Sequence, residues 1–166
     1  MYDDSYILRD TTDGDVNVTI TMPENEKDFI NLVHLRDRKT KEEVEFDQDS
    51  VVITEKVSIL TGLKVGDCIR IYKPDKLGNP TDEFYDLKIT GICDFYITNK
   101  IFIGSRAYEN YIQVDPTSKK PSSNFAVLLS KQSNSANEDN FKSELIYKSK
   151  QVEIINAIAS TRDEVI

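Results

Sequence analysis

The stretch TEKVSILTGLKVGDCIRIY, residues 54–72, decides our interpretation of the fold. Thr54 stands where it could cap a helix, and Glu55 places a negative charge in the first turn, where it suits the helix dipole. Gly62 fits the left-handed position that ends many helices. The pattern therefore predicts a short helix between these residues. Its buried stripe is predicted to contain three apolar residues, Val57, Ile59 and Leu60.

A tight turn and a strand follow this helix. We expect Leu63 and Val65 to pack back over the helix end. Gly66 supplies backbone freedom for the turn, and Asp67 can accept hydrogen bonds from nearby amides. CIRIY, residues 68–72, then leaves the turn as a strand.

Three neighbouring patterns predict more strands and turns. VNVTITM, residues 16–22, alternates and predicts a strand with one buried side, which Pro23 ends. PDKLGNPTDE, residues 74–83, is rich in turn formers and predicts a hairpin loop. The return strand over residues 84–98 contains Gly91, where we expect a bulge or bend.

Short strands joined by hairpins dominate the chain. We therefore predict an α+β fold with a mostly antiparallel β-sheet and three or four short helices, in a single domain over residues 1–166 or in one domain of two lobes. The other expected segments are an acidic, turn-rich opening up to Asp15, a helical turn at 24–27, strands at 29–35, 100–103 and 124–130, a hairpin tip at 98–99, and helices at 106–113, capped by Ser105, and 141–148.

The charge balance restricts the partners. The chain has 166 residues, 21 Lys and Arg against 29 Asp and Glu, and a net charge of -8. Because phosphate groups need a basic surface, we expect no nucleic-acid partner and no docking onto an anionic membrane. No stretch approaches the roughly 18 consecutive apolar residues of a membrane span, and the opening residues do not resemble a signal peptide. We expect a soluble protein or a soluble piece of a longer one.

The cysteines and the single histidine favour structural roles. Cys68 and Cys93 are predicted to be small buried side chains in strands, with a disulfide between them as the less favoured alternative. His34 lies in a predicted strand, and we expect it on the polar side rather than in a catalytic group. One histidine offers no metal-binding spacing, so no metal or cofactor site is predicted.

The acidic clusters also favour solvated surfaces. Asp10, Asp13 and Asp15 do not have the spacing of a calcium-binding loop and are interpreted as an acidic turn. A second set of carboxylates, interpreted as a charged turn and an edge strand, consists of Glu42, Glu43, Glu45, Asp47 and Asp49. No catalytic residue is therefore assigned. Asn17 begins a glycosylation sequon, a match that is common by chance.

Four tyrosines, Tyr85, Tyr96, Tyr108 and Tyr111, cluster in sequence around the predicted hairpin and helix. Tyrosine rings can form a binding surface because they supply contact area at a low entropic cost. They can also be half-buried residues that complete a small core, which is the interpretation we favour.

The order of these parts resembles a known family. VVITEKVSILTGLKVGDCIRIY, then a hairpin loop, then DLKITGICDFYITNKIFIGSRAYENYI, is similar to the large extracytoplasmic domain of FtsX/MacB-like ABC transporter permeases. The resemblance covers residues 51–112. The matching positions are Val51, Val52, Ile53, Glu55, Leu63, Val65, Gly66, Asp67, Thr90, Gly91, Ile92, Tyr96, Tyr108 and Glu109.

The resemblance implies a non-enzymatic domain outside the cell membrane, anchored by transmembrane helices beyond this segment. The implied partners are the transmembrane helices of the same permease, indirectly a cytoplasmic ATPase subunit, and an unknown extracytoplasmic substrate or protein. Such a domain would couple binding outside the cell to movement of the membrane helices. The closing residues AIASTRDEVI are similar to the segment that leads toward the next membrane helix.

Two other functions stay open. The chain could be a free-standing β-rich binding module that uses the hairpin tyrosines as its ligand face. It could also be a hydrolase that uses carboxylates such as Glu43 and Asp47, which would require a cleft and a carboxylate of raised pKa. We rank the permease domain first and the hydrolase last.

Overall fold

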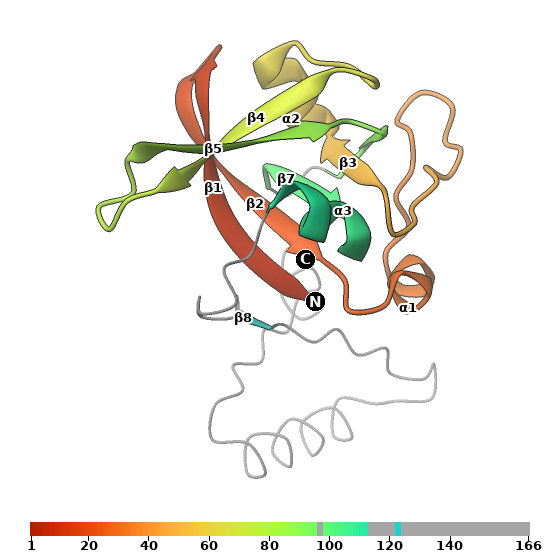
Figure 1. Cartoon of the computed structure of the whole chain (residues 1–166). Coiled ribbons are helices and arrows are strands. Elements are labelled where there is room, and N and C mark those ends of the chain that lie inside the picture. The colour runs from red at the N-terminus through yellow and green to blue at the C-terminus, as the bar shows by residue number, and fades with distance from the viewer. Residues whose placement is uncertain (96–97, 113–121, 124–166) are drawn as a thin grey trace, which may run out of the picture. The chain divides into compact units, whose positions relative to one another are not determined.

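The computed structural model describes residues 1–95, 98–112 and 122–123, which belong to a compact unit reaching from Met1 to Ala126 (Figure 1). The predicted strand at 124–130 and the predicted helix at 141–148 lie outside the described residues. The prediction of one domain over residues 1–166 also extends beyond them and stays a prediction.

The described residues form one mixed sheet with three short helices, which confirms the predicted α+β class. The strands are β1 (Tyr2–Thr11), β2 (Gly14–Met22), β3 (Val51–Thr54), β4 (Cys68–Pro74), β5 (Pro80–Lys88), β6 (Gly91–Cys93), β7 (Lys100–Ile103) and β8 (Ser122–Ser123). The helices are α1 (Glu26–Leu32), α2 (Glu55–Thr61) and α3 (Ser105–Tyr111).

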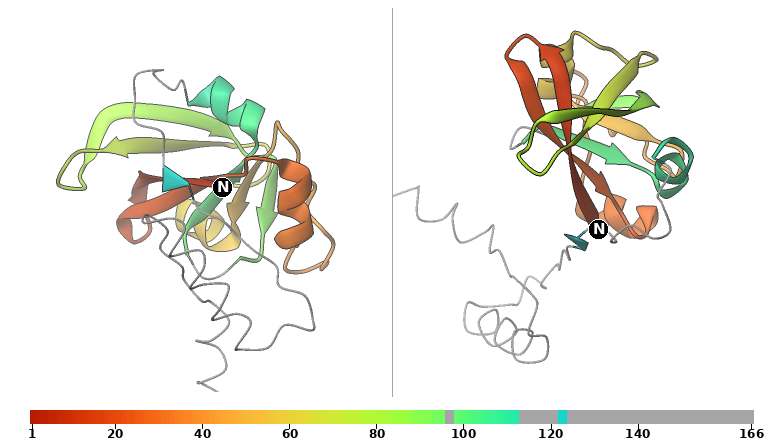
Figure 2. Two further views of the ribbon diagram at one scale, coloured as in Figure 1. Left: turned by 90° about the horizontal axis from the view of Figure 1, so that it is seen from below. Right: turned by 60° about the vertical axis from the view of Figure 1, so that its left-hand side comes forward.

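The sheet has the strand order β5-β4-β1-β2-β7-β3-β6, and β8 pairs with β1. Most pairs are antiparallel, while β2 with β7 and β3 with β6 are parallel. The outermost strands β5 and β6 are consecutive in the chain, separated only by Ile89 and Thr90. Because β5 pairs with β4 and β6 pairs with β3, this one stretch of chain joins both ends of the strand order, and the sheet curls round (Figure 2).

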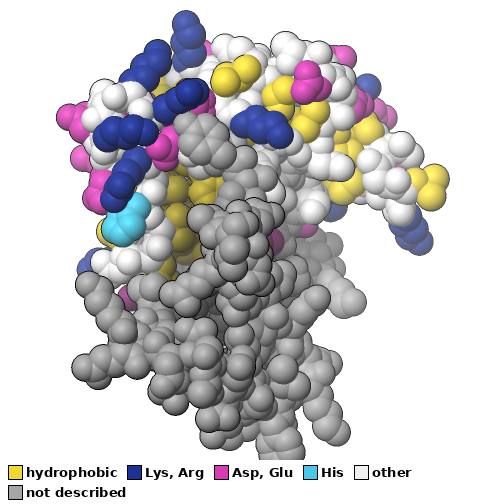
Figure 3. Space-filling model, turned by 180° about the vertical axis from the view of Figure 1, so that it is seen from behind, with side chains coloured by type: hydrophobic (Ala, Val, Ile, Leu, Met, Phe, Trp, Pro, Cys, Tyr) yellow, Lys and Arg dark blue, Asp and Glu magenta, His cyan; other side chains and the backbone are white. Residues whose placement is uncertain are grey.

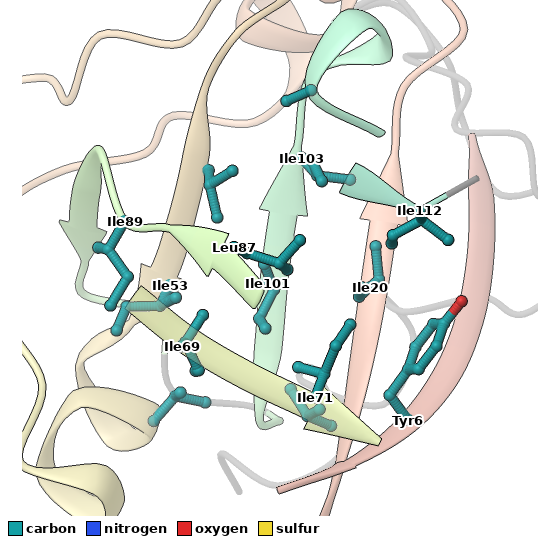
Figure 4. Packing of buried hydrophobic residues seen from close by; sticks show 14 of the residues in the cluster. Tyr6, Ile20, Ile53, Ile69, Ile71, Leu87, Ile89, Ile101, Ile103 and Ile112 are labelled. Carbon is teal, nitrogen blue, oxygen red and sulfur yellow. The ribbon is translucent and has the colours of Figure 1, made fainter. Parts of the chain in front are cut away.

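The first hydrophobic core, called the inner core below, lies inside this curved sheet (Figure 4). Alternate residues of the strands point inward, as the side-chain period of two requires. The side chains from α2 and α3 in this core include Val57 and Tyr108. The largest inward-facing residues of the strands are Leu8, Ile20, Ile53, Ile69, Ile71, Leu87, Ile101 and Ile103.

A second core lies outside the curved sheet, between α1, the segment that follows it and the outer sides of β3 and β7. The Phe29 ring lies 5.1 Å from the Phe46 ring and 5.7 Å from the Phe102 ring, measured between centroids. Leu35, Val52 and Cys93 complete the buried set. Phe29 is thus the residue through which α1 is attached to the sheet.

Two predictions for the first third of the chain are wrong. Residues 2–11 form β1 rather than a turn-rich opening, because Tyr6 and Leu8 enter the inner core while Arg9 and Asp10 are exposed. Phe29–Leu32 belongs to α1 rather than to a strand. The Asn25 side chain accepts hydrogen bonds from the amides of Lys27 and Asp28 and so begins a helix.

The predicted helix of the opening stretch is confirmed as α2, with two corrections. Gly62 has φ 72 and ends the helix in the left-handed conformation, as predicted. Thr54 is at the N-cap position, but its side chain makes no capping hydrogen bond, and its hydroxyl accepts one from the Lys100 amide at 3.5 Å. Ile59 was predicted to be buried and is 66% exposed, because only Val57 and Leu60 face the core.

The residues after α2 also depart in part from the prediction. Leu63 packs against the inner core, as expected. Val65 is 57% exposed and does not, because the chain turns outward before Gly66. The hairpin between β4 and β5 is confirmed, with antiparallel register from Cys68 opposite Lys88 to Tyr72 opposite Phe84.

The second predicted hairpin is wrong. β6 and β7 are not neighbours, because β3 lies between them, parallel to β6 and antiparallel to β7. Gly91 marks the predicted interruption, and a Cβ there would approach the Val44 side chain to 2.6 Å. Helix α3 begins at Ser105 with Gly104 at its N-cap, so Ser105 does not cap it as predicted.

Candidate functional site

An open hollow of ≈ 380 Å³ lies beside α1. Its lining is apolar at the base and acidic at the rim: Ile30, Val33, His34, Leu35, Glu43, Val44, Glu45, Phe46 and Asp47. Leu35 and Phe46 belong to the second core. The sequence analysis named these acids but did not predict the hollow. Residues 29–35, which contribute to its lining, were predicted to form a strand, whereas Phe29–Leu32 belongs to α1.

His34 lies at the rim, exposed rather than buried (cyan in Figure 3). Its Nδ1 lies 3.2 Å from Glu43 Oε1, and both side chains are more than half exposed. It follows α1 instead of lying in a strand, which corrects its predicted placement. The described residues place no hydroxyl or thiol nucleophile in hydrogen-bond contact with the imidazole.

Asp47 holds the turn before β3. Its Oδ1 accepts hydrogen bonds from the Ser50 hydroxyl at 2.8 Å and from the Asp49 amide at 2.9 Å. The hydrogen bond from Ser50, followed by that from Asp49, lowers the pKa of Asp47 below its ordinary value. A hydrolase of the kind considered above needs a carboxylate with a raised pKa, so the shift at Asp47 has the opposite sign.

The remaining acids of this cluster are on the surface. Asp49 forms a two-point ion pair with Arg106, whose Nε and NH2 lie 2.6 and 2.7 Å from the carboxylate oxygens. Glu42 and Glu45 are exposed. These positions agree with the prediction of a solvated charged turn for this segment, although only an isolated bridge between Arg36 and Glu43 replaces the expected edge strand.

The acidic turn of the opening residues joins β1 to β2. Asp10 has φ 54, a left-handed conformation that aspartate tolerates, and its amide donates to Asp15 Oδ1 at 3.3 Å. The Thr11 hydroxyl donates to the Gly14 carbonyl at 2.6 Å. Among the described residues, no group of three or more His, Cys, Asp or Glu could hold a metal ion.

The Gly66–Asp67 turn leads into β4 and is also hydrogen-bonded to Ile89, which follows β5. Gly66 has φ 95, which a glycine adopts without strain. Its amide donates to the Ile89 carbonyl at 2.9 Å, and the Ile89 amide donates to the Asp67 carbonyl at 2.9 Å. The Asp67 carboxylate accepts from the Lys64 amide at 2.8 Å, as predicted. The turn therefore starts β4 and also fixes the end of β5.

Two of the four tyrosines complete the inner core. Tyr108 is buried, and Tyr85 is partly buried and contacts Tyr6 edge to face, with ring centroids 6.0 Å apart. Burial, then the hydrogen bond to Glu83, raises the pKa of Tyr85 to about 12. Tyr111 is exposed, and Tyr96 lies outside the described residues. Tyr6 was missed because β1 was missed.

Both cysteines are free thiols. Cys93 is buried, as predicted, and burial raises the pKa of its thiol to about 11. Cys68 is exposed, which corrects the prediction, because it faces outward from β4 opposite Lys88.

Comparisons with models of protein families, with curated proteins and with solved structures found no match to this chain. No helix in the described part of the chain has both the length and the apolar character needed to cross a membrane.

Proposed function

We propose that the chain is an extracytoplasmic domain of an FtsX/MacB-like ABC transporter permease, which couples an extracytoplasmic substrate or partner to movement of the transmembrane helices. The observation that carries the proposal is the double role of the Gly66–Asp67 turn. In the resemblance this turn is one part of an ordered set of motifs, and here its backbone bonds to Ile89 tie the helix–turn–strand unit to the strand that follows the hairpin.

The rest of the resembling region supports the same proposal. Val51 in β3, Val57 in α2, Ile69 in β4, Ile101 in β7 and Tyr108 in α3 all enter one core. The described residues between 51 and 112 therefore pack as one body around that core. A body of this kind can transmit a displacement from its surface to attached helices without being deformed, because packed interiors have low compressibility.

Polar contacts extend this body to α1. Glu26, in the first turn of α1, accepts two hydrogen bonds from Ser105 in the first turn of α3. Arg106 forms a two-point ion pair with Asp49, and the Ala107 amide donates to the Gln48 carbonyl at 2.9 Å. These contacts favour coupling rather than catalysis as the use of the described polar residues.

The test is the gene that encodes the chain, followed by purification of the full-length product. The proposal expects apolar spans of about twenty residues before residue 1 and after residue 166, and an adjacent ATPase gene. It also expects the ATPase to co-purify with the full-length protein in detergent. A start and a stop codon at the two ends of the segment, with no ATPase partner, would contradict it.

A free-standing binding module is the alternative, and one observation favours it. Phe84 is 45% exposed and Leu77 is 87% exposed on the ribbon formed by β4 and β5, which extends away from α1 (Figure 1). Exposed apolar side chains that share a projecting element are typical of interaction sites. The gene boundaries distinguish the two functions, because this alternative expects an open reading frame that ends near residue 166.

A further inference from the structure

The outer side of β1, β4 and β5 carries a row of side chains that the function proposed above does not use. Ile7 lies opposite Tyr72, and Tyr72 lies opposite Phe84. Ile69, Ile71 and Leu87 alternate with these residues and are buried in the inner core. The row therefore faces away from that core, on the outside of the curved sheet.

Two arginines cover the aromatic members of the row. The Arg9 guanidinium carbon lies 5.1 Å from the centroid of the Tyr72 ring, and that of Arg70 lies 4.0 Å from the centroid of the Phe84 ring. The two rings are 5.9 Å apart. These are cation–π distances, so each ring carries a positive charge beside it. Arg9, Arg70, Tyr72, Phe84 and Asp86 are called the arginine–aromatic face below.

The face is held in place before anything binds. Arg70 Nε and NH2 donate to the two Asp86 carboxylate oxygens at 2.7 and 2.8 Å. A two-point pair of this kind fixes the plane of the guanidinium group. Ile7, which belongs to the row, is only 2% exposed. Side chains that are already ordered lose little conformational entropy on binding, which favours affinity.

The charges of the face indicate the partner. Arg70 is compensated by Asp86, whereas Arg9 has no ion pair among the described residues. The whole chain has a net charge of -8, so a positive charge beside exposed rings contrasts with the rest of the molecule. A carboxylate of a partner can therefore pair with Arg9 without displacing an ion pair of Arg9 within the described residues.

We propose that the arginine–aromatic face binds a protein segment that presents a carboxylate next to a large apolar side chain. The carboxylate pairs with Arg9, and the apolar side chain packs on Tyr72 and Phe84. Tyrosine, phenylalanine and arginine are enriched in protein interfaces, and arginine is suited to carboxylates because its donors form a fork. The inference is independent of whether the chain belongs to a permease.

A titration with synthetic peptides tests this inference. The isotope-labelled 166-residue chain is mixed with a short, end-blocked peptide that alternates glutamate with phenylalanine, and its amide signals are followed by NMR. The expected result is saturable shifts centred on β1, β4 and β5. The matched peptide with lysine in place of glutamate is expected to give no saturable shift.

Four variants make the test specific. Arg9→Glu and Phe84→Ser are each expected to weaken binding by about tenfold or more, as removal of a central interface residue does. Lys39→Glu and Ile59→Ser are the matched controls, since both residues are exposed and lie elsewhere, and they are expected to leave binding unchanged.

Three results would overturn the proposal: no saturable shift with the glutamate peptide, equal binding of the lysine peptide, or unchanged binding in Arg9→Glu. No saturable shift would mean that the arginines and rings serve only in packing, and either of the other two results would mean that Arg9 does not select a carboxylate. If Phe84→Ser loses its dispersed spectrum, Arg9→Glu decides alone, because Arg9 is on the surface and makes no contact with the inner core.

Discussion

Ser105 donates both its amide and its hydroxyl to one carboxylate oxygen, Oε1 of Glu26, at 2.9 and 2.6 Å, across 79 residues of sequence. Glu26 lies in the first turn of α1 and Ser105 in the first turn of α3. The pair therefore joins α1, which packs in the second core, to α3, which packs in the inner core. Because the bonded group is a charged carboxylate, each bond is stronger than one between neutral groups.

Removal of this carboxylate is predicted to destabilise the chain. Glu26→Ala leaves the partly buried amide and hydroxyl of Ser105 without their acceptor, and we expect a loss of about 1–3 kcal/mol in the free energy of unfolding. Glu26→Gln is expected to lose less, because its amide oxygen can still accept. Urea denaturation of both variants measures the loss.

Glu24→Gln is the matched control for this prediction. Glu24 is exposed, precedes α1, and is expected to change stability by no more than about 0.5 kcal/mol. A loss in Glu26→Ala no larger than that of the control would mean that the two helices are joined by packing alone.

The stability of the chain is predicted to fall in acid. Burial acts to raise the pKa of Glu26, but the hydrogen bonds from Ser105 outweigh it and hold the pKa below the ordinary 4.5. The hydrogen bonds from Ser50 and Asp49 likewise hold the pKa of Asp47 below 3.8. A carboxylate with a lowered pKa stabilises the fold above its unfolded pKa, and this contribution is lost as the pH falls through the folded value.

Thermal unfolding between pH 7 and pH 2 tests this prediction. We expect a stable plateau above about pH 5 and a decline below it, because ordinary carboxyl groups have pKa values near 4. The variant Asp47→Asn is expected to show a shallower decline than the parent protein. An acid limb of equal slope in both would show that Asp47 contributes nothing to it.

Features that depend on a few consecutive residues were the ones that the sequence predicted best. Gly62 and the Gly66–Asp67 turn were predicted because a left-handed glycine and a carboxylate that accepts an amide act within a few residues. Of helix α1 only a helical turn at 24–27 was predicted, although the signal for the whole helix was local. Asn25, followed by acids at Glu26 and Asp28, is a helix start, but the apolar run after it was given more weight.

Other features could not be predicted from local patterns. β3 lies between β6 and β7, a pairing that depends on contacts roughly forty to fifty residues apart in sequence, such as Ile53 with Ile101. The arginine–aromatic face depends on pairings between distant strands in the same way. The cation–π contact between Arg9 and Tyr72, for example, requires β1 to lie beside β4. Sequence spacing alone contains no information on this contact.

The two thiols are predicted to react at very different rates. Cys68 is exposed, whereas Cys93 is buried in the second core with a pKa of about 11. Because the thiolate is the reactive form, Cys93 is protected by both burial and protonation. A thiol-specific chromogenic reagent at pH 8 should therefore label one cysteine per native chain and both in denaturant. Fast labelling of two thiols in the native protein would show that the second core opens readily. The variant Cys68→Ser identifies which thiol reacts in the native protein.

Gly104 is predicted to tolerate no side chain. A Cβ at this position would collide with the backbone carbonyl oxygens of Asp47 and Gln48, which cannot move aside as a flexible side chain does. The Gly104 amide also donates to the Ser50 carbonyl at 2.8 Å, so the backbone cannot move away without losing this bond. We therefore expect Gly104→Ala to lower the free energy of unfolding by about 1–3 kcal/mol or more, as overpacking does.

Gly78→Ala is the comparison that separates collision from backbone strain. Gly78 has φ 85 with nothing within 4 Å of an added Cβ, so its substitution carries only the left-handed penalty of about 1–2 kcal/mol. Gly104 lies at a φ of -70, where alanine is unstrained, and its cost would be collision alone. Chemical denaturation of both variants measures the two costs. A native-like stability for Gly104→Ala would mean that the 47–50 turn can shift, and would remove the rigid attachment of α3 on which the coupling proposal depends.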